Sequence, residues 1–142
     1  MTKFDEAFVL SKLSRRLDIK FKKRKPNLKG WGRPDGYAIV DGVSLFVEIE
    51  NTQKHPDTNV LKYWPFLEEE GTEKMILVHV FSSQSPGVSG SRSSLAEWVA
   101  KKICSKFGDK FKYFRIIFRM PEEEIEGLEK LSHLIRRLKE RV

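Results

Sequence analysis

The dipeptide Asp41-Gly42 constrains the fold of this chain more than any other feature, because it separates two apolar runs and predicts a tight β-hairpin. Residues 36–40 and 43–50 are then antiparallel strands. Once the turn is fixed, the register places Asp35 opposite Glu48. Neighbours that share a face of such a pair have Cβ atoms about 5 Å apart. The hairpin therefore brings two carboxylates together.

A third carboxylate, Glu50, follows Glu48 by two residues on the same predicted strand, so both side chains point to one face of the sheet. Paired carboxylates raise each other's pKa unless a cation lies between them, and a divalent metal with oxygen ligands removes that cost. A solvent-exposed face would make the pair harmless. With Asp35 on the neighbouring strand, however, three carboxylates lie within reach of one metal ion.

The remaining patterns predict a single α/β domain over residues 1–142, with the order αβββαβ followed by αβα. A proline at position 65 predicts that the helix after Pro56 kinks or restarts there. His79, inside an apolar run, is interpreted as a buried, hydrogen-bonded strand residue. The expected helices are 3–17, a segment opening at Pro56, 95–107 and 122–141, and the remaining expected strands are 19–25, 74–81 and 111–119.

Composition is typical of a soluble globular protein, with 39% hydrophobic and 33% charged residues. The single cysteine, Cys104, excludes an internal disulfide framework and a cysteine-rich zinc site. The apolar runs are too short to cross a membrane, and acids stand where a signal peptide would have its apolar centre. We therefore expect a cytoplasmic protein without membrane contact.

Positive charge is concentrated in one segment rather than spread along the chain. Between Lys12 and Arg33 there are ten Lys and Arg residues against one acid, Asp18. Such a patch favours contact with the phosphate backbone of a nucleic acid, although a solvated edge is the alternative. Trp31, flanked by glycines, is a candidate for stacking on a base. The predicted nucleic-acid contacts are Lys20, Lys22, Lys23, Arg24, Lys25, Lys29, Trp31 and Arg33.

Glu6 is a fourth candidate acid, on the first predicted helix. At about 100° per residue it lies near the apolar stripe formed by Leu10, Leu13 and Leu17, which would direct it toward the sheet. The alternative is a glutamate at a helix start, favoured by the helix dipole, whose carboxylate reaches solvent.

The spacing Pro34-Asp35, twelve residues, then Glu48-Ile49-Glu50 resembles the signature of the PD-(D/E)XK nuclease superfamily. The resemblance covers residues 3–82 and includes the element order and the acid on the first helix. It implies a restriction-endonuclease-like αβββαβ core with a mixed central sheet flanked by helices, followed by an αβα extension. It also implies a metal-dependent DNA endonuclease using Mg²⁺ or Mn²⁺, with Asp35, Glu48 and Glu50 as metal ligands and Glu6 in support.

This chain departs from the family at position 50, where Glu stands in place of the usual Lys. Some restriction endonucleases of the family carry Glu there, as a metal ligand or as the base that orients water. In other members the catalytic lysine is relocated: a lysine of the following helix reaches the site and stabilises charge on the phosphate. Lys62 is the first candidate for that role and Lys54 the second. Asn59 and Tyr63 have the spacing of the Gln-x-x-x-Tyr motif of RecB-like nucleases, with Asn in place of Gln.

Two alternatives to a nuclease remain open on the sequence. A non-catalytic nucleic-acid-binding module would keep the same fold and the basic segment. An interaction protein would use the apolar stripe of residues 122–141 as a seam between two copies, although packing on its own sheet suits the stripe slightly better. Archaeal Holliday junction resolvases, which are similar in size, act as dimers, so a homodimer is a further expectation.

Overall fold

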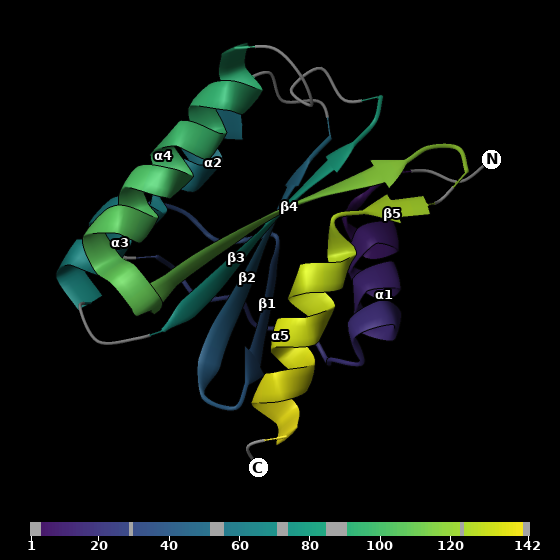
Figure 1. Ribbon diagram of the computed structural model, residues 1–142, viewed down its shortest axis with the longest axis horizontal. Coiled ribbons are helices and arrows are strands. Elements are labelled where there is room, and N and C mark those ends of the chain that lie inside the picture. Colours follow the sequence, from purple (N-terminus) through teal and green to yellow (C-terminus); the bar gives the residue numbers. More distant parts are fainter. Residues whose placement is uncertain are drawn as a thin grey trace.

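The computed structural model describes residues 4–28, 30–51, 56–70, 74–84, 91–122 and 124–140, and it contains a five-stranded sheet in the order β1-β2-β3-β4-β5 (Figure 1). The strands are β1 (Gly36–Val40), β2 (Val43–Glu50), β3 (Met75–Ser82), β4 (Phe111–Arg119) and β5 (Glu124–Glu126). The helices are α1 (Glu6–Leu17), α2 (Pro56–Leu61), α3 (Tyr63–Glu70), α4 (Ser91–Phe107) and α5 (Leu128–Glu140), with a 3-10 turn at Gly108–Lys110.

The sheet is mixed, as expected from the sequence. The predicted hairpin is confirmed: β1 and β2 are antiparallel, and Gly36 is paired with Val47. The strands β2, β3 and β4 are parallel to one another, while β5 returns antiparallel to β4. The carboxyl ends of three strands therefore lie at one edge of the sheet, which is where α/β proteins commonly place their functional side chains.

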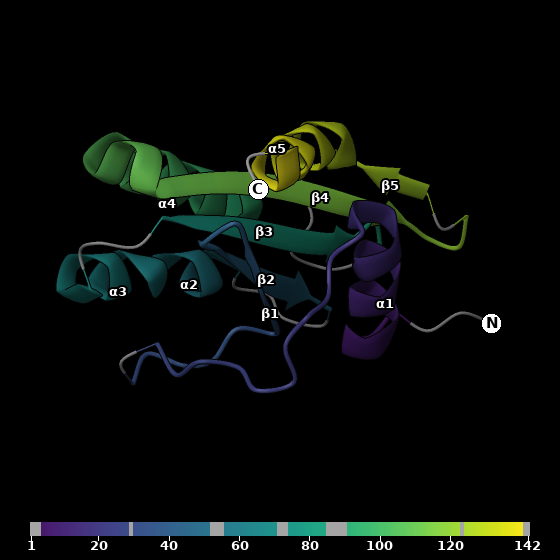
Figure 2. The ribbon, with the colours of Figure 1, turned by 90° about the horizontal axis from the view of Figure 1, so that it is seen from below.

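Helices cover both faces of the sheet (Figures 1 and 2). On one face, α1 and α5 bury an aliphatic cluster that includes Leu13, Val47 and Ile135. On the other face, α2, α3 and α4 pack on a more aromatic cluster that includes Phe46 and Tyr63. This division follows from the alternation of side chains along β2, because Val47 and Ile49 face one helical layer while Phe46 faces the other.

The expected strand at residues 19–25 is wrong. Figure 2 shows the connection between α1 and β1 as a long irregular segment below the sheet. One backbone hydrogen bond, from the Lys22 amide to the Tyr37 carbonyl (2.7 Å), joins it to the edge of β1. Ile19 and Phe21 pack against the aliphatic cluster, but from Lys22 to Lys25 every residue is basic, so the apolar alternation of a strand ends there. The predicted αβββαβ order is corrected accordingly to αββααβ, followed by αββα.

The predicted last helix also begins later than expected, at Leu128 rather than Glu122. The preceding residues form β5, in which Ile125 pairs with Phe118 and packs against the aliphatic cluster. Gly127 ends this strand with φ +88°, and a Cβ at this position would lie 2.6 Å from the Arg115 carbonyl oxygen. Only glycine fits there, so the helix starts at the next residue.

The other elements agree with the sequence pattern, apart from an earlier start of α4. Pro65 lies in the first turn of α3, which confirms the restart that this residue predicts. Asp5 caps α1, where its carboxylate accepts a hydrogen bond of 2.8 Å from the Phe8 amide. None of the described helices has the length and apolar character needed to span a membrane.

Candidate active site

The β1–β2 hairpin places Asp35 beside Glu48, as the register predicts. The Asp35 amide donates to the Val47 carbonyl (2.9 Å), and its carboxylate Oδ2 accepts from the Ile49 amide (2.7 Å). Asp35 is half-buried. Desolvation by the surrounding protein raises the pKa of its carboxyl group, and the hydrogen bond from Ile49 partly opposes that shift.

Glu48 is almost completely buried, with 2% of its surface exposed, so a harmless solvent-facing position is excluded. The Nζ of Lys62 lies 2.9 Å from each of its carboxylate oxygens, and the Tyr63 hydroxyl donates to Oε2. Desolvation nevertheless raises the pKa of Glu48 to about 7, because these partners and the nearby charge of Asp35 do not balance the loss of water. Burial also raises the pKa of Tyr63, which is therefore the donor in this bond.

Glu50 points to the same face as Glu48 but has a different set of partners. Its Oε1 accepts a hydrogen bond from Asn59 Nδ2 (2.6 Å) and lies 2.9 Å from His79 Nε2. His79 lies on β3, and its Nδ1 lies 2.7 Å from the Tyr113 hydroxyl on β4. Glu50 and His79 are both fully buried, so the interpretation of His79 as a buried, hydrogen-bonded residue is confirmed.

Two residues of this network, Tyr113 and Arg115, carried only a weak signal in the sequence. They alternate with apolar residues along β4, which indicates a polar face but not what that face contacts. In the structure Tyr113 bonds His79, and the Arg115 guanidinium donates to Ser93 Oγ of α4 (2.9 Å). The order of β2, β3 and β4 in the sheet brings these groups together, and no local motif predicts that order.

Glu6 lies near the site but does not point into the sheet. About half of its side chain is exposed, and its carboxylate forms an ion pair with Lys25. Its negative charge still contributes to the raised pKa of Asp35. The expectation that Glu6 faces the sheet is therefore wrong, because its place in the first turn of α1 lets the carboxylate pass the helix end and reach solvent and Lys25.

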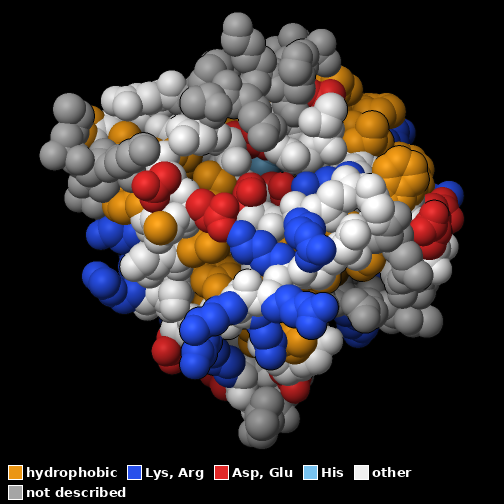
Figure 3. All heavy atoms as spheres, turned by 180° about the vertical axis from the view of Figure 1, so that it is seen from behind, with side chains coloured by type: hydrophobic (Ala, Val, Ile, Leu, Met, Phe, Trp, Pro, Cys, Tyr) orange, Lys and Arg blue, Asp and Glu red, His pale blue; other side chains and the backbone are white. Residues whose placement is uncertain are grey.

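The basic segment lies on the same side of the molecule as the carboxylates. Figure 3 shows acidic side chains around a hollow near the middle of this face, with Lys and Arg side chains beside them. Lys25 is half-buried, and its carbonyl accepts from the Arg33 guanidinium (2.7 Å). Lys29 and Lys54 lie outside the described residues. The exposed members of the segment are Lys20, Lys22, Lys23, Arg24, Trp31 and Arg33.

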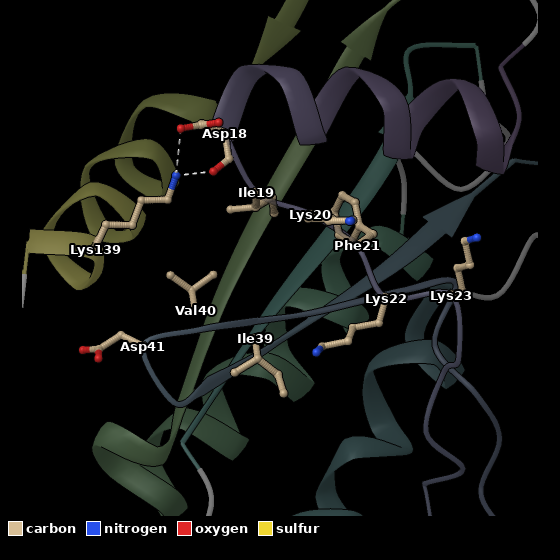
Figure 4. A pocket seen from close by; sticks show the side chains of 10 residues that line it. All are labelled: Asp18, Ile19, Lys20, Phe21, Lys22, Lys23, Ile39, Val40, Asp41 and Lys139. Atoms are coloured by element: carbon tan, nitrogen blue, oxygen red, sulfur yellow. Dashed lines mark hydrogen bonds and ion pairs between the residues drawn. The ribbon is translucent and has the colours of Figure 1, made fainter. Parts of the chain in front are cut away.

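A groove of about 700 Å³ runs between this segment and the end of the β1–β2 hairpin (Figure 4). Its apolar lining includes Phe21 and Ile39, and Lys20, Lys22 and Lys23 supply positive charge. At the far end Lys139 forms an ion pair with Asp18 (3.3 Å), which leaves the first three lysines as the groove's main source of positive charge.

The donor chemistry of Asp35 and Glu48 suits a hard divalent cation. Mg²⁺ commonly binds one or two carboxylates and keeps several water ligands. A cation between these groups would also offset the desolvation that raises both pKa values. Among the described residues, however, no three His, Cys, Asp or Glu side chains are grouped closely enough to hold a metal ion. Glu50 accordingly faces Asn59 and His79 and does not complete a triad.

No family model matches this sequence, and no curated protein or solved structure matches it.

Proposed function

We propose that this chain is a divalent-metal-dependent DNA endonuclease with a restriction-endonuclease-like fold of the PD-(D/E)XK type. The observation that carries the proposal is the arrangement of Asp35, Glu48 and Lys62. The half-buried Asp35, which precedes β1, and the buried Glu48 on β2 both have raised pKa values, and a lysine lies 2.9 Å from Glu48. Metal ligands and a cation for the phosphate are the groups that phosphodiester hydrolysis requires.

In this proposal Asp35 and Glu48 hold Mg²⁺ or Mn²⁺, and the ion, when bound, neutralises phosphate charge and acidifies a water molecule. Lys62 takes the place of the family lysine, because it reaches Glu48 from the turn between α2 and α3. A metal ion held by these carboxylates would leave the Lys62 ammonium available to the phosphate. Glu6 and Lys25 border Asp35 and add charge at the edge of the site.

The basic groove supports the choice of a nucleic acid as substrate. Negative charge on the carboxylates alone would repel a phosphodiester, whereas Lys25 and Lys62 near them and the groove lysines further along the segment would attract it. Phosphate contacts by Lys20, Lys22 and Lys23 would position the DNA without reading its sequence.

One assay tests the proposal: incubation with linear, nicked, flapped and branched DNA in Mg²⁺, in Mn²⁺ and in EDTA. We expect metal-dependent cleavage by the wild type and loss of cleavage in Asp35→Asn and Glu48→Gln, with DNA affinity retained. Lys62→Met should lower the rate by about 100-fold, the usual loss when a charge stabiliser is removed. Lys106→Met, which removes an exposed ion pair with Glu68 on another surface, is the matched control and should cleave normally.

A non-catalytic DNA-binding module is the second candidate function. The specific observation in its favour is that Glu50 is engaged with Asn59 and His79, so the described residues offer two carboxylates rather than three. DNA binding without cleavage of any substrate in either metal would establish this alternative and overturn the nuclease proposal.

A further inference from the structure

A chain of buried hydrogen bonds crosses the sheet from β4 to α2. The Tyr113 hydroxyl lies 2.7 Å from His79 Nδ1, and His79 Nε2 lies 2.9 Å from Glu50 Oε1. The same Glu50 oxygen accepts from Asn59 Nδ2 at 2.6 Å. The chain therefore joins β4, β3, β2 and α2 through side chains that are far apart in the sequence.

The distances suit a neutral His79 between Glu50 and Tyr113. With Glu50 as a carboxylate, which only accepts hydrogen bonds, His79 Nε2 is the donor. Nδ1 then accepts from Tyr113, since a neutral imidazole donates from one nitrogen and accepts at the other. Full burial lowers the pKa of His79 and agrees with the neutral form. The ring and the carboxylate are held in one orientation.

Burying such a polar network costs free energy, and an apolar side chain at position 79 would favour stability more. His79 packs against Phe81, with ring centroids 4.5 Å apart, and Leu77 precedes it on the same face of β3. Buried polar groups of this kind are often neutral or unfavourable for stability when compared with well-packed apolar residues. A role of His79 in positioning another side chain would explain why a polar residue occupies this site.

The chain of hydrogen bonds ends at Asn59, and Lys62 lies close to that residue in the sequence. Asn59 lies on α2, one helical turn before Lys62, and Tyr63 opens α3 directly afterwards. Both Lys62 and Tyr63 contact Glu48. The orientation of α2 therefore determines where the ammonium and the phenol meet the carboxylate.

We propose that His79 is a positioning residue: acting through Glu50 and Asn59, it anchors α2 to the sheet and so holds Lys62 against Glu48. The effect on Lys62 placement is independent of activity. The effect on catalysis rests on the proposed nuclease function.

The first test measures how reactive Lys62 is toward an amine-acylating reagent, by mass spectrometry of the folded protein. In the wild type its Nζ is held by Glu48 and its side chain is 13% exposed. His79→Leu should increase the acylation rate of Lys62 by about tenfold, the effect expected when a hydrogen bond to a charged group is lost. Lys102, exposed on α4, is the internal reference and should not change.

A matched control separates positioning from a general loss of stability. Val80 follows His79 on β3, is fully buried and faces the opposite cluster. Val80→Ala destabilises the same strand without touching the network, so Lys62 should keep its wild-type reactivity. Equal Lys62 reactivity in His79→Leu and the wild type would overturn the proposal, as would an equal rise in Val80→Ala.

Two milder variants keep the test decisive if His79→Leu does not fold. Asn59→Ala removes the link at α2, and Tyr113→Phe removes one hydroxyl from the far end of the network. Both should raise Lys62 acylation, with the larger effect in Asn59→Ala because Asn59 is closer to Lys62. Unchanged reactivity in Asn59→Ala would contradict the role of α2.

The catalytic arm uses the cleavage assay. His79→Leu should lower kcat by about tenfold to 100-fold, because a small displacement of a catalytic group has a large effect on rate. KM and DNA affinity should stay within twofold of the wild type, since the hydrogen bonds that link Tyr113, His79, Glu50 and Asn59 do not include the described residues of the basic segment. If the wild type cleaves no DNA, the nuclease proposal fails while the acylation result still decides the positioning of Lys62. If Lys62 became more reactive in His79→Leu while kcat stayed normal, the position of Lys62 would not affect catalysis.

Discussion

At the scale of single residues, Glu48 shows most clearly how stability and the proposed function conflict. It is buried with Lys62 and Tyr63 as partners, and its pKa is still raised to about 7. The folded protein thus holds a carboxyl group that resists ionisation at neutral pH. Because metal ligands have to be deprotonated, metal binding at the proposed site would release the proton of Glu48 and would depend on pH.

This raised pKa predicts a pH-dependent stability. Glu48 has a pKa of about 7 in the folded state against an ordinary value of 4.5, so between these values the folded protein binds more protons than the unfolded chain. Stability from this group is therefore present below pH 4.5 and is lost as the pH rises through 7. Urea unfolding of the metal-free proteins measures this loss. As the pH rises across this range, the unfolding free energy of the wild type should fall by roughly 3 kcal/mol relative to that of Glu48→Gln.

The comparison with Glu48→Gln is needed because other buried groups titrate too. The lowered pKa of His79 acts in the opposite direction, and stability from the neutral ring is lost as the pH falls below 6.5. Glu129→Gln, which changes an exposed acid on α5, is the control and should give a flat difference. A flat difference for Glu48→Gln as well would show that this carboxyl group titrates normally.

At the scale of elements, the sequence predicts what depends on local pattern. Asp41-Gly42 sets the hairpin register, and that register alone places Asp35 beside Glu48. The partners of Glu50 could not be predicted in the same way, because His79 comes from a strand 29 residues later and its position depends on the order of the sheet. The segment 19–25 begins with the alternation of a strand, with Ile19 and Phe21 against the core, but the following residues are all basic and the segment is irregular.

The helix α5 illustrates the same limit and gives a prediction at this scale. The spacing of its apolar residues predicts an amphipathic helix but not the surface that it covers. In the structure Leu128, Leu131, Ile135 and Leu138 are buried against the helix's own sheet, which is the packing that the sequence favoured over a seam between two copies.

Leu131→Ala should therefore destabilise the folded chain by about 2 to 5 kcal/mol, the range for a large-to-small change in a core. The unfolding free energy from urea titration measures this loss. Sedimentation should show the same oligomeric state for variant and wild type, because a fully buried Leu131 cannot contribute to an interface. Leu134→Ala, at a half-buried position of the same helix, should lose less. A stability that rises with protein concentration in the wild type and not in Leu131→Ala would place the residue in an interface instead.

At the scale of the whole molecule, the face shown in Figure 3 carries acidic side chains near its middle and basic side chains beside them. The groove lysines lie toward Asp41 at the turn of the β1–β2 hairpin, whereas Asp35 and Glu48 lie at its open end. In the proposed function the carboxylates bind a metal ion and the lysines attract the DNA. The two regions therefore do different work in the proposal. Binding should depend on the basic segment, and cleavage should depend on the metal and Lys62.

This division predicts that DNA affinity falls steeply with salt and that the basic segment accounts for the slope. Each phosphate contact adds roughly 0.9 to the slope of log K against log salt for duplex DNA. Reversing Lys20 and Lys22 to Glu should lower the slope by roughly 2 and weaken all sequences alike, because phosphate contacts carry no sequence information. Fluorescence polarisation with labelled duplexes from 50 to 300 mM salt measures both quantities.

The control for this prediction is a variant with the same change in net charge on another surface. Lys101 and Lys102 are exposed on α4, which lies on the far side of the sheet from the basic segment in Figures 1 and 2. Reversing both to Glu should leave the slope within experimental error, since screened charges act over only about 10 Å at 0.1 M salt. Equal losses in the two variants would mean that net charge alone attracts DNA. A loss confined to the Lys101 and Lys102 variant would place the DNA on α4, away from Asp35 and Glu48, and the proposed site would then have no route to its substrate.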